Sequence, residues 1–435
     1  MGSMETEPSV VLNCFAGPDQ GKRLALTEQE VVIGRSAQCN VASDDPDVAE
    51  RHVTFRLREG QPSFQVVGEA TVFVDGAALK EGVLRPGQQA RIGRSLWQVA
   101  SVANTQSFTE LLDNIGGQIS SAAGVEKIQG FNVREMFSAI FQKRSDDEIE
   151  QYFSVGGPST TPPLATVDTN WPKPWLFFKA FVAAAIVYAC FAFGWQQFQN
   201  ANLLPGMITV GSFVMPFSIL IFFFEVNAPR NVSLYQVFKL VLLGGALSLV
   251  ASLFLFQLTN LSSTMGPPAA GIVEEVGKAL VLLLVVNKLR YRWTLNGMLF
   301  GAAIGTGFAA FESSGYAFRY LWNTNSSQVM THVIYTRAWL SILGGHVLWA
   351  SMVGAALWRV RGDEKFRWDM VKDIRFWRVL AIATGVHAVW NCNFSLPLYL
   401  KEIALGFVAW VVILSLIQDG LKQIRAAQAQ MKRAA

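Results

Sequence analysis

The sequence predicts a multi-domain chain in which an N-terminal all-β sandwich precedes an α-helical polytopic membrane domain of about eight transmembrane helices. Two observations lead to this fold class. The first part of the chain alternates apolar and polar side chains between turn-forming segments, a pattern typical of the short strands of a sandwich. From residue 175 onward, apolar runs of about 17–22 residues recur, and each is close to the length that crosses a bilayer.

Composition agrees with this division. Hydrophobic residues make up 51% of the 435 residues and charged residues 16%. The four cysteines are scattered without a CxxC pair, so we expect neither a disulfide framework nor a zinc ribbon. A net charge of +4 is too small to indicate a nucleic-acid partner. The N-terminus has no apolar segment, so no cleavable signal peptide is expected.

Three segments precede the membrane domain. Residues 8–103 are predicted to form the β-sandwich, which is expected to be cytosolic. Residues 104–153 change to a helical period and predict an amphipathic helical hairpin, in which Ser145 and Glu148 form the capping box of the second helix. Residues 154–174 are rich in Pro, Gly and Thr, which is typical of a linker.

The membrane domain is predicted over residues 175–420 and is followed by a basic tail at 421–435. Its eight expected spans are 175–196, 204–225, 236–257, 270–287, 295–316, 336–358, 376–393 and 399–418. Lys and Arg are concentrated in alternate loops and in the tail, while the intervening loops have very few. By the positive-inside rule, both termini of this integral membrane protein are expected to be cytoplasmic.

Polar side chains interrupt four of the predicted spans. They are Glu274, Glu275, Glu312, His346, His387 and Asn391. A carboxylate or imidazole at membrane depth costs several kcal/mol by most estimates, so it is seldom present without a role. The topology places all six in the non-cytoplasmic half of the bilayer. Their convergence at one depth predicts a functional site.

Three further side chains are expected to support this site. Lys278 lies four residues after Glu274 and three after Glu275, so it can face either carboxylate. Tyr316 shares a helix face with Glu312, and Trp390 precedes Asn391. A stripe of small residues, Gly297, Gly301 and Gly305, predicts close packing of the fifth span.

Several kinds of function compete for this pattern. The polar groups could be structural, as interhelical hydrogen bonds or a buried Glu274–Lys278 pair, or could form the relay of a proton-coupled transporter. The chain has no inverted repeat to favour a transporter. It also lacks GxSxG and HExxH motifs and has no intramembrane Asp dyad. The remaining hydrolytic chemistry is water activated by a carboxylate, either directly or on a metal.

Four motifs follow one another in the membrane domain, within a region of about residues 170–420. They are EExxK (Glu274, Glu275, Lys278), FExxxY (Phe311, Glu312, Tyr316), the single His346 and HxxWN (His387, Trp390, Asn391). This pattern resembles the PrsW intramembrane proteases, relatives of the CAAX prenyl protease superfamily. The resemblance implies cleavage of a single-span membrane protein within or beside the bilayer of a bacterial plasma (inner) membrane. An inactive membrane sensor or scaffold is the other reading of such a chain.

Two mechanisms fit these residues. In a glutamate mechanism, Glu274 or Glu275 deprotonates water while His387 and Asn391 stabilise the oxyanion. In a metal mechanism, His346, His387 and Glu312 bind Zn²⁺ and Glu275 is the base. The glutamate mechanism is slightly favoured, because Asn391 is a poor zinc ligand and the paired carboxylates supply a base unaided.

The N-terminal segments VVIGRSAQCNV, DVAERHVTF and TVFVDG resemble a forkhead-associated (FHA) domain. In that family an Arg after Gly grips phosphate, a Ser three residues before a His binds phosphothreonine, and an Asn holds the peptide backbone. Here Gly34-Arg35 and Arg51-His52 are present, but Ala49 occupies the Ser position and the Asn position also differs. A docking module for a cytosolic protein is therefore favoured over phosphoprotein recognition by Arg35 and Arg51, and His52 is expected to pack.

Overall fold

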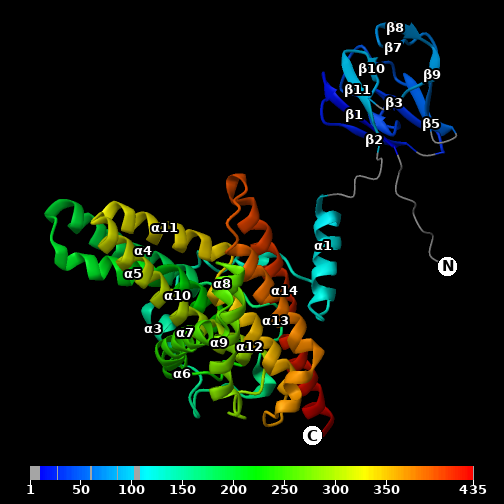
Figure 1. Cartoon of the computed structure of the whole chain (residues 1–435). Coiled ribbons are helices and arrows are strands. Elements are labelled where there is room, and N and C mark those ends of the chain that lie inside the picture. The colour runs from blue at the N-terminus through cyan, green and yellow to red at the C-terminus, as the bar shows by residue number, and fades with distance from the viewer. Residues whose placement is uncertain (1–9, 27, 59–60, 86, 102–107, 435) are drawn as a thin grey trace. The chain divides into compact units, whose positions relative to one another are not determined.

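The computed structural model describes residues 10–26, 28–58, 61–85, 87–101 and 108–434 (Figure 1). The chain divides into two compact units, Met1–Leu111 and Leu112–Ala435.

The first unit is an all-β sandwich, as predicted. One sheet has the strand order β2-β1-β11-β10-β7-β8 and the other the order β4-β3-β5-β6-β9. The strands are β1 (Val10–Ala16), β2 (Arg23–Leu26), β3 (Val31–Gly34), β4 (Val41–Ala42), β5 (Val53–Arg58), β6 (Gln61–Val66), β7 (Val72–Val74), β8 (Ala77–Leu79), β9 (Glu81–Val83), β10 (Gln89–Ile92) and β11 (Ser95–Ser101).

Alternation along the strands builds the core of this sandwich. In β1, Val10, Leu12 and Cys14 point inward, and the strand pairs antiparallel with both β2 and β11. Phe55 and Trp97 are fully buried between the sheets. The alternation of apolar and polar residues, which predicted the strands, therefore also gives each strand the apolar face that forms the core.

The second unit is helical. Its helices are α1 (Phe108–Ala122, which begins in the first unit), α2 (Val133–Met136), α3 (Asp146–Phe153), α4 (Leu176–Phe198), α5 (Leu204–Val226), α6 (Leu234–Lys239), α7 (Gly245–Thr259), α8 (Leu261–Met265), α9 (Ala269–Val286), α10 (Thr294–Thr324), α11 (Ser327–Leu343), α12 (His346–Arg361), α13 (Ile374–Trp390) and α14 (Leu400–Ala434). A π-helical turn, η3 (Leu240–Gly244), joins α6 to α7. Most of these helices pack around one apolar core.

Among the described residues, six helical segments are long and apolar enough to cross a membrane. They are Leu176–Phe198, Ala201–Val226, Leu234–Thr259, Thr294–Thr324, Ser327–Arg361 and Pro397–Arg433. The predicted count of eight is not confirmed. The two other expected spans correspond to α9, which contains Glu274, Glu275 and Lys278, and to α13, which has only 17 residues.

The predicted span 336–358 lies within the candidate segment Ser327–Arg361, but its helix is interrupted near the middle. α11 ends at Leu343, α12 begins at His346, and Gly344 and Gly345 between them have extended backbones, with φ of −172° and 170°. Glycine has a low helix propensity, and two in succession favour a break in a helix. His346 therefore lies in the first turn of a new helix, beside the break.

The predicted small-residue stripe packs α10 against α12. A Cβ atom on Gly297 would lie 2.4 Å from the carbonyl oxygen of Gly354, and one on Gly301 would lie 2.0 Å from that of Ala350. A Cβ on Gly305 would lie 2.3 Å from the carbonyl oxygen of His346. Glycine at these positions lets the two backbones meet, which fixes His346 relative to α10.

The segments before α4 differ in part from the prediction. The capping box of Ser145 and Glu148 at the start of α3 is confirmed. The hairpin is not regular, because α2 has four residues and is followed by turns, which leave Phe141 86% exposed. The linker is irregular apart from η1 (Leu164–Thr166), and the expected basic tail continues α14 as helix.

Candidate active site

The polar side chains predicted from the sequence converge from four helices. α9 supplies Glu274 and Glu275, α10 supplies Glu312, α12 supplies His346 and α13 supplies His387. α9 packs against α10, α12 and α13, and α12 packs against both α10 and α13. The expectation of a single cluster agrees with this arrangement.

Glu275 is held by two partners. Its Oε1 atom accepts a hydrogen bond from Nζ of Lys278 at 2.6 Å and lies 2.9 Å from Nδ1 of His387. Glu275 and Lys278 are both fully buried. Of the two carboxylates that Lys278 could face, the fold therefore pairs it with Glu275. The ammonium also lies 4.4 Å from the centre of the Phe308 ring.

Glu312 holds the other histidine. Its Oε2 atom lies 2.9 Å from Nε2 of His346 and also accepts a hydrogen bond from Arg337. The Nε atom of Arg337 donates to the hydroxyl of Ser313 at 2.8 Å, which fixes the guanidinium. Nothing in the local sequence pattern around Arg337 indicates that α11 would turn it toward Glu312.

Glu274 lies between the two imidazoles. Its Oε2 atom is 3.7 Å from Nδ1 of His346 and 3.8 Å from Nε2 of His387. This buried oxygen has no hydrogen-bond donor among the described residues. The carboxylates of Glu312 and Glu275 accept from the opposite nitrogen of each ring, which directs the ring lone pairs toward Glu274. Nζ of Lys278 also approaches Nδ1 of His346, at 3.1 Å.

Glu274, His346 and His387 form the described group that could hold a metal ion, with one donor atom of each within 4.8 Å of the others. Two histidines and one glutamate are a common ligand set for catalytic zinc. Each histidine has a carboxylate on its second nitrogen, an arrangement typical of metal-bound imidazoles. The residues thus fit a zinc ion, and the carboxylate in this group is that of Glu274 and not that of Glu312, which the sequence predicted.

A cavity of about 330 Å³ opens onto these groups. Its polar lining includes Glu274, Glu312, Tyr316, Arg337, His346, His387 and Asn391. Trp390 also lines the cavity, and Trp349 stacks on the ring of His387 with centroids 4.1 Å apart. The supporting residues Tyr316 and Trp390 therefore face the same space as the carboxylates. Trp349 and Arg337 are residues that the sequence reasoning missed.

The first unit has three residues of the FHA pattern, Arg35, Arg51 and His52. Arg35 and Arg51 are both exposed, after β3 and before β5. His52 is buried, accepts a hydrogen bond from the Ala49 amide at 3.1 Å, and places Nε2 3.0 Å from the carbonyl oxygen of Thr71. The imidazole therefore ties two loops together, in agreement with its expected packing role.

Two family models match the chain. Residues 233–417 match "PrsW family intramembrane metalloprotease", and residues 13–103 match "Inner membrane component of T3SS, cytoplasmic domain".

Each of the curated relatives aligns with this chain over 89 residues. The oxoglutarate dehydrogenase inhibitor of Corynebacterium efficiens is 30% identical over 20% of this chain, and the chain spans 61% of that relative's length. The glycogen accumulation regulator GarA of Mycolicibacterium smegmatis is 32% identical over 20% of this chain, which spans 55% of GarA. The chain thus spans about three fifths or less of the length of these relatives.

Among solved structures, the FHA domain of a Chlamydia trachomatis protein is 17% identical, with 22% of this chain and 98% of that chain covered and a TM-score of 0.21. The cytoplasmic domain of the sorting platform protein PscD from P. aeruginosa is 18% identical, with 22% and 83% covered and a TM-score of 0.21.

Proposed function

With a PrsW-family domain at residues 233–417 and an FHA-like sandwich before it, we propose that this protein is a membrane-embedded endopeptidase. It hydrolyses a peptide bond of a single-span membrane protein. The observation that supports this most is the buried Oε2 atom of Glu274, which has no donor among the described residues and faces both His346 and His387. A buried carboxylate oxygen without a donor is costly, so its presence favours a chemical role.

We propose that Glu274, His346 and His387 hold a zinc ion. When bound, zinc polarises a carbonyl group and favours ionisation of water near neutral pH. The chain's own residues prepare the site. Glu275 keeps the proton of His387 on Nδ1, and Glu312 keeps that of His346 on Nε2, so that the lone pair of each ring lies on the opposite nitrogen. Nδ1 of His346 is also 3.1 Å from Nζ of Lys278, and a bound cation would replace this contact.

Other side chains of the cavity act on the substrate. Asn391 and Tyr316 line the cavity beside Glu274, where an amide or phenol can donate to the carbonyl oxygen of the scissile bond. Glu275 is committed to Lys278 and His387, so it serves as a positioning residue rather than the base. In the glutamate mechanism the base is then Glu274, whose second oxygen faces the two histidines.

The test is cleavage of a single-span substrate by the full chain in lipid vesicles, together with metal analysis. We expect stoichiometric zinc and chelator-sensitive cleavage in the unchanged protein, and loss of both in His346→Ala. His332→Ala is the matched control, because His332 is exposed on α11 and does not line the cavity. Cleavage without metal that resists chelators would contradict the zinc site and leave Glu274 as the base. Accumulation of a substrate inside the vesicles without cleavage would favour a transporter. The absence of both cleavage and accumulation would favour a scaffold.

For the FHA-like sandwich we propose docking of a cytosolic protein, with both termini on the cytoplasmic side of the plasma membrane. Exposed Arg35 retains the guanidinium that suits a phosphate. The Ser position of the FHA pattern is Ala49, whose amide is occupied by His52. We therefore expect phosphothreonine peptides to bind the unchanged full chain weakly, and to bind the Arg35→Ala variant with a similar affinity. Tight binding that Arg35→Ala abolishes would instead establish phosphoprotein recognition.

A further inference from the structure

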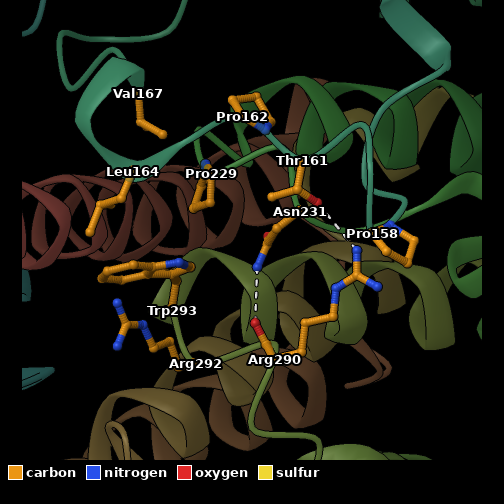
Figure 2. Close-up of a pocket in the computed structure, with 10 residues that line it drawn as sticks. All are labelled: Pro158, Thr161, Pro162, Leu164, Val167, Pro229, Asn231, Arg290, Arg292 and Trp293. Carbon is orange, nitrogen blue, oxygen red and sulfur yellow. Dashed lines mark hydrogen bonds between the residues drawn. The ribbon is translucent and has the colours of Figure 1, made fainter.

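A second pocket, separate from the cavity that contains Glu274, lies where the linker meets the loop between α9 and α10. Its volume is about 390 Å³. It is lined by Pro158, Thr161, Pro162, Leu164, Val167, Pro229, Asn231, Arg290, Arg292 and Trp293 (Figure 2). None of these ten lining residues is acidic, and two are arginines.

Arg290 is held in place by the linker. Its Nη2 atom donates to the carbonyl oxygen of Gly156 at 2.5 Å and to the hydroxyl of Thr161 at 3.2 Å. The backbone carbonyl of Arg290 accepts from the buried Asn231 side chain at 3.2 Å (Figure 2). Both ends of the residue are therefore fixed, which orients its guanidinium before any ligand arrives.

Arg292 has a charge that the protein satisfies only in part. Its guanidinium lies over the Trp293 ring, 4.5 Å from the centroid, beside the pocket (Figure 2). Within the described part of the chain, it makes no hydrogen bond, and its one ion pair, to Asp363, has a separation of 3.8 Å. That pair is solvent-exposed, with side chains 41% and 68% accessible, so it contributes little. The Arg292 donors are therefore available to an anion.

The pocket lies near the ends of two candidate membrane helices, α5 and α10, and of α9. α5 ends at Val226 and α9 at Val286, while α10 begins at Thr294, and each of these ends is within a few residues of the lining. Lipid headgroups occupy this level of a bilayer. Apolar Leu164, Val167 and Trp293 line the same pocket as the arginines, which suits a ligand with a charged part and an apolar part.

We propose that this pocket binds an anionic glycerophospholipid headgroup whose phosphate is held by Arg292, while Arg290, held by the linker at the Thr161 side of the pocket, adds positive charge (Figure 2). Guanidinium groups match phosphate geometry and are the usual residues for its recognition. The net negative charge distinguishes such a headgroup from a zwitterionic one. Because Arg290 already contacts the linker, an occupied pocket ties the linker more firmly to the loop between α9 and α10. Those helices contain Glu274 and Glu312, so the lipid would stabilise the unit that bears the active site.

The test uses the full chain in a neutral detergent and measures its melting temperature. The probes are dihexanoyl-phosphatidylglycerol, dihexanoyl-phosphatidylcholine and glycerol 1-phosphate. At about tenfold its dissociation constant, we expect the phosphatidylglycerol to raise the melting temperature by about 2–4 °C, and the phosphatidylcholine by much less. Arg292→Gln should lose this difference. Lys239→Gln should keep it, because Lys239 is exposed and outside the pocket.

Each outcome decides the proposal. An equal shift from glycerol 1-phosphate, lost in Arg292→Gln, supports the phosphate site but assigns it to a soluble compound. Equal shifts from both lipids, or an undiminished shift in Arg292→Gln, would overturn it. If Arg292→Gln does not fold, Arg292→Lys is the second variant, because it keeps the positive charge but lacks the paired N–H donors of a guanidinium group. Native mass spectrometry should then detect less phosphatidylglycerol bound to Arg292→Lys than to the unchanged protein.

Discussion

Both units of this protein bury carboxylates, but they treat them differently. In the sandwich, Asp19 accepts from the Ser43 hydroxyl at 2.5 Å, from the Asp44 amide at 2.8 Å and from Lys22 at 2.8 Å. Asp45 accepts from the amides of Asp47 and Arg94. Both oxygens of each aspartate are therefore paired, and the carboxylates fasten loops to one another.

In the helical unit, Glu274 and Glu275 each have a buried Oε2 atom without a donor among the described residues. Glu225, in the same unit, is saturated, because its two oxygens accept from the backbone amides of Trp175, Leu176 and Phe177 at the start of α4. Glu225 shows that the two kinds of carboxylate occur within the same helical unit, so the unit in which a carboxylate lies does not decide whether its oxygens are paired. A saturated carboxylate stabilises a fold, whereas an unsaturated one beside a cavity is available for chemistry.

The largest expected effect comes from the unsaturated carboxylate. Glu274→Gln should lower the rate of substrate cleavage by about 10²–10⁴-fold, since it removes a charge that acts directly on the reaction. In the metal-free protein the melting temperature should stay close to that of the unchanged protein, because no hydrogen bond to Glu274 Oε2 is lost. Cleavage in vesicles and a thermal melt measure the two. A large loss of stability with unchanged cleavage per folded molecule would show that Glu274 stabilises the fold and does not take part in the reaction.

The close packing that positions the site is the next most sensitive feature. Gly301→Val should cost about 1–3 kcal/mol or more, because its Cβ would lie 2.0 Å from the carbonyl oxygen of Ala350. Gly315→Ala on the same helix is the control, since a Cβ there meets nothing within 4 Å. Thermal unfolding of both variants is the measurement. Equal stabilities would show that α10 and α12 need no such contact.

Glu225→Gln tests the saturated carboxylate. It should destabilise the helical unit by about 1–3 kcal/mol, because charge-assisted hydrogen bonds to three amides of α4 are weakened. Cleavage per folded molecule should be retained. The measurement is the melting temperature together with cleavage well below it. If this variant lost cleavage without losing stability, saturation would not separate structural from catalytic carboxylates.

The smallest effect is the pH dependence of the sandwich. Burial opposes ionisation of Asp19, but the hydrogen bonds from Lys22, Ser43 and the Asp44 amide outweigh it and hold the pKa of Asp19 below its usual value of 3.8. A lowered pKa in the folded state means that Asp19 stabilises the sandwich above the unfolded pKa. This stabilisation is lost as the pH falls through the folded pKa.

We therefore expect the sandwich to lose about 1 kcal/mol as the pH falls below about 4, and Asp19→Asn to lack this component. Hydrogen exchange of the β1 and β11 amides, corrected for intrinsic rates, follows the unit within the full chain. Identical pH profiles for the two proteins would argue that Asp19 contributes no pH-dependent stability.

The amino-acid sequence by itself determined the fold class, the polar residues of the site and the resemblance to PrsW proteases. These depend on local information: a period of two for strands, long apolar runs for membrane helices, and residue types at fixed spacings. The small-residue stripe of α10 and the capping box of α3 also follow from local spacing. Each could be predicted because neighbours in sequence are neighbours in the structure.

Only the tertiary structure decided which side chains of the site contact one another. Lys278 lies within one helical turn of both glutamates, and the rotation of α9 against its neighbours pairs it with Glu275. The same packing places Glu274, and not Glu312, between the two histidines, and turns Arg337 of α11 onto Glu312. These contacts join residues up to 113 positions apart, as Glu274 and His387 are. Helix orientation and side-chain rotamers set such contacts, and spacing within one helix does not encode them.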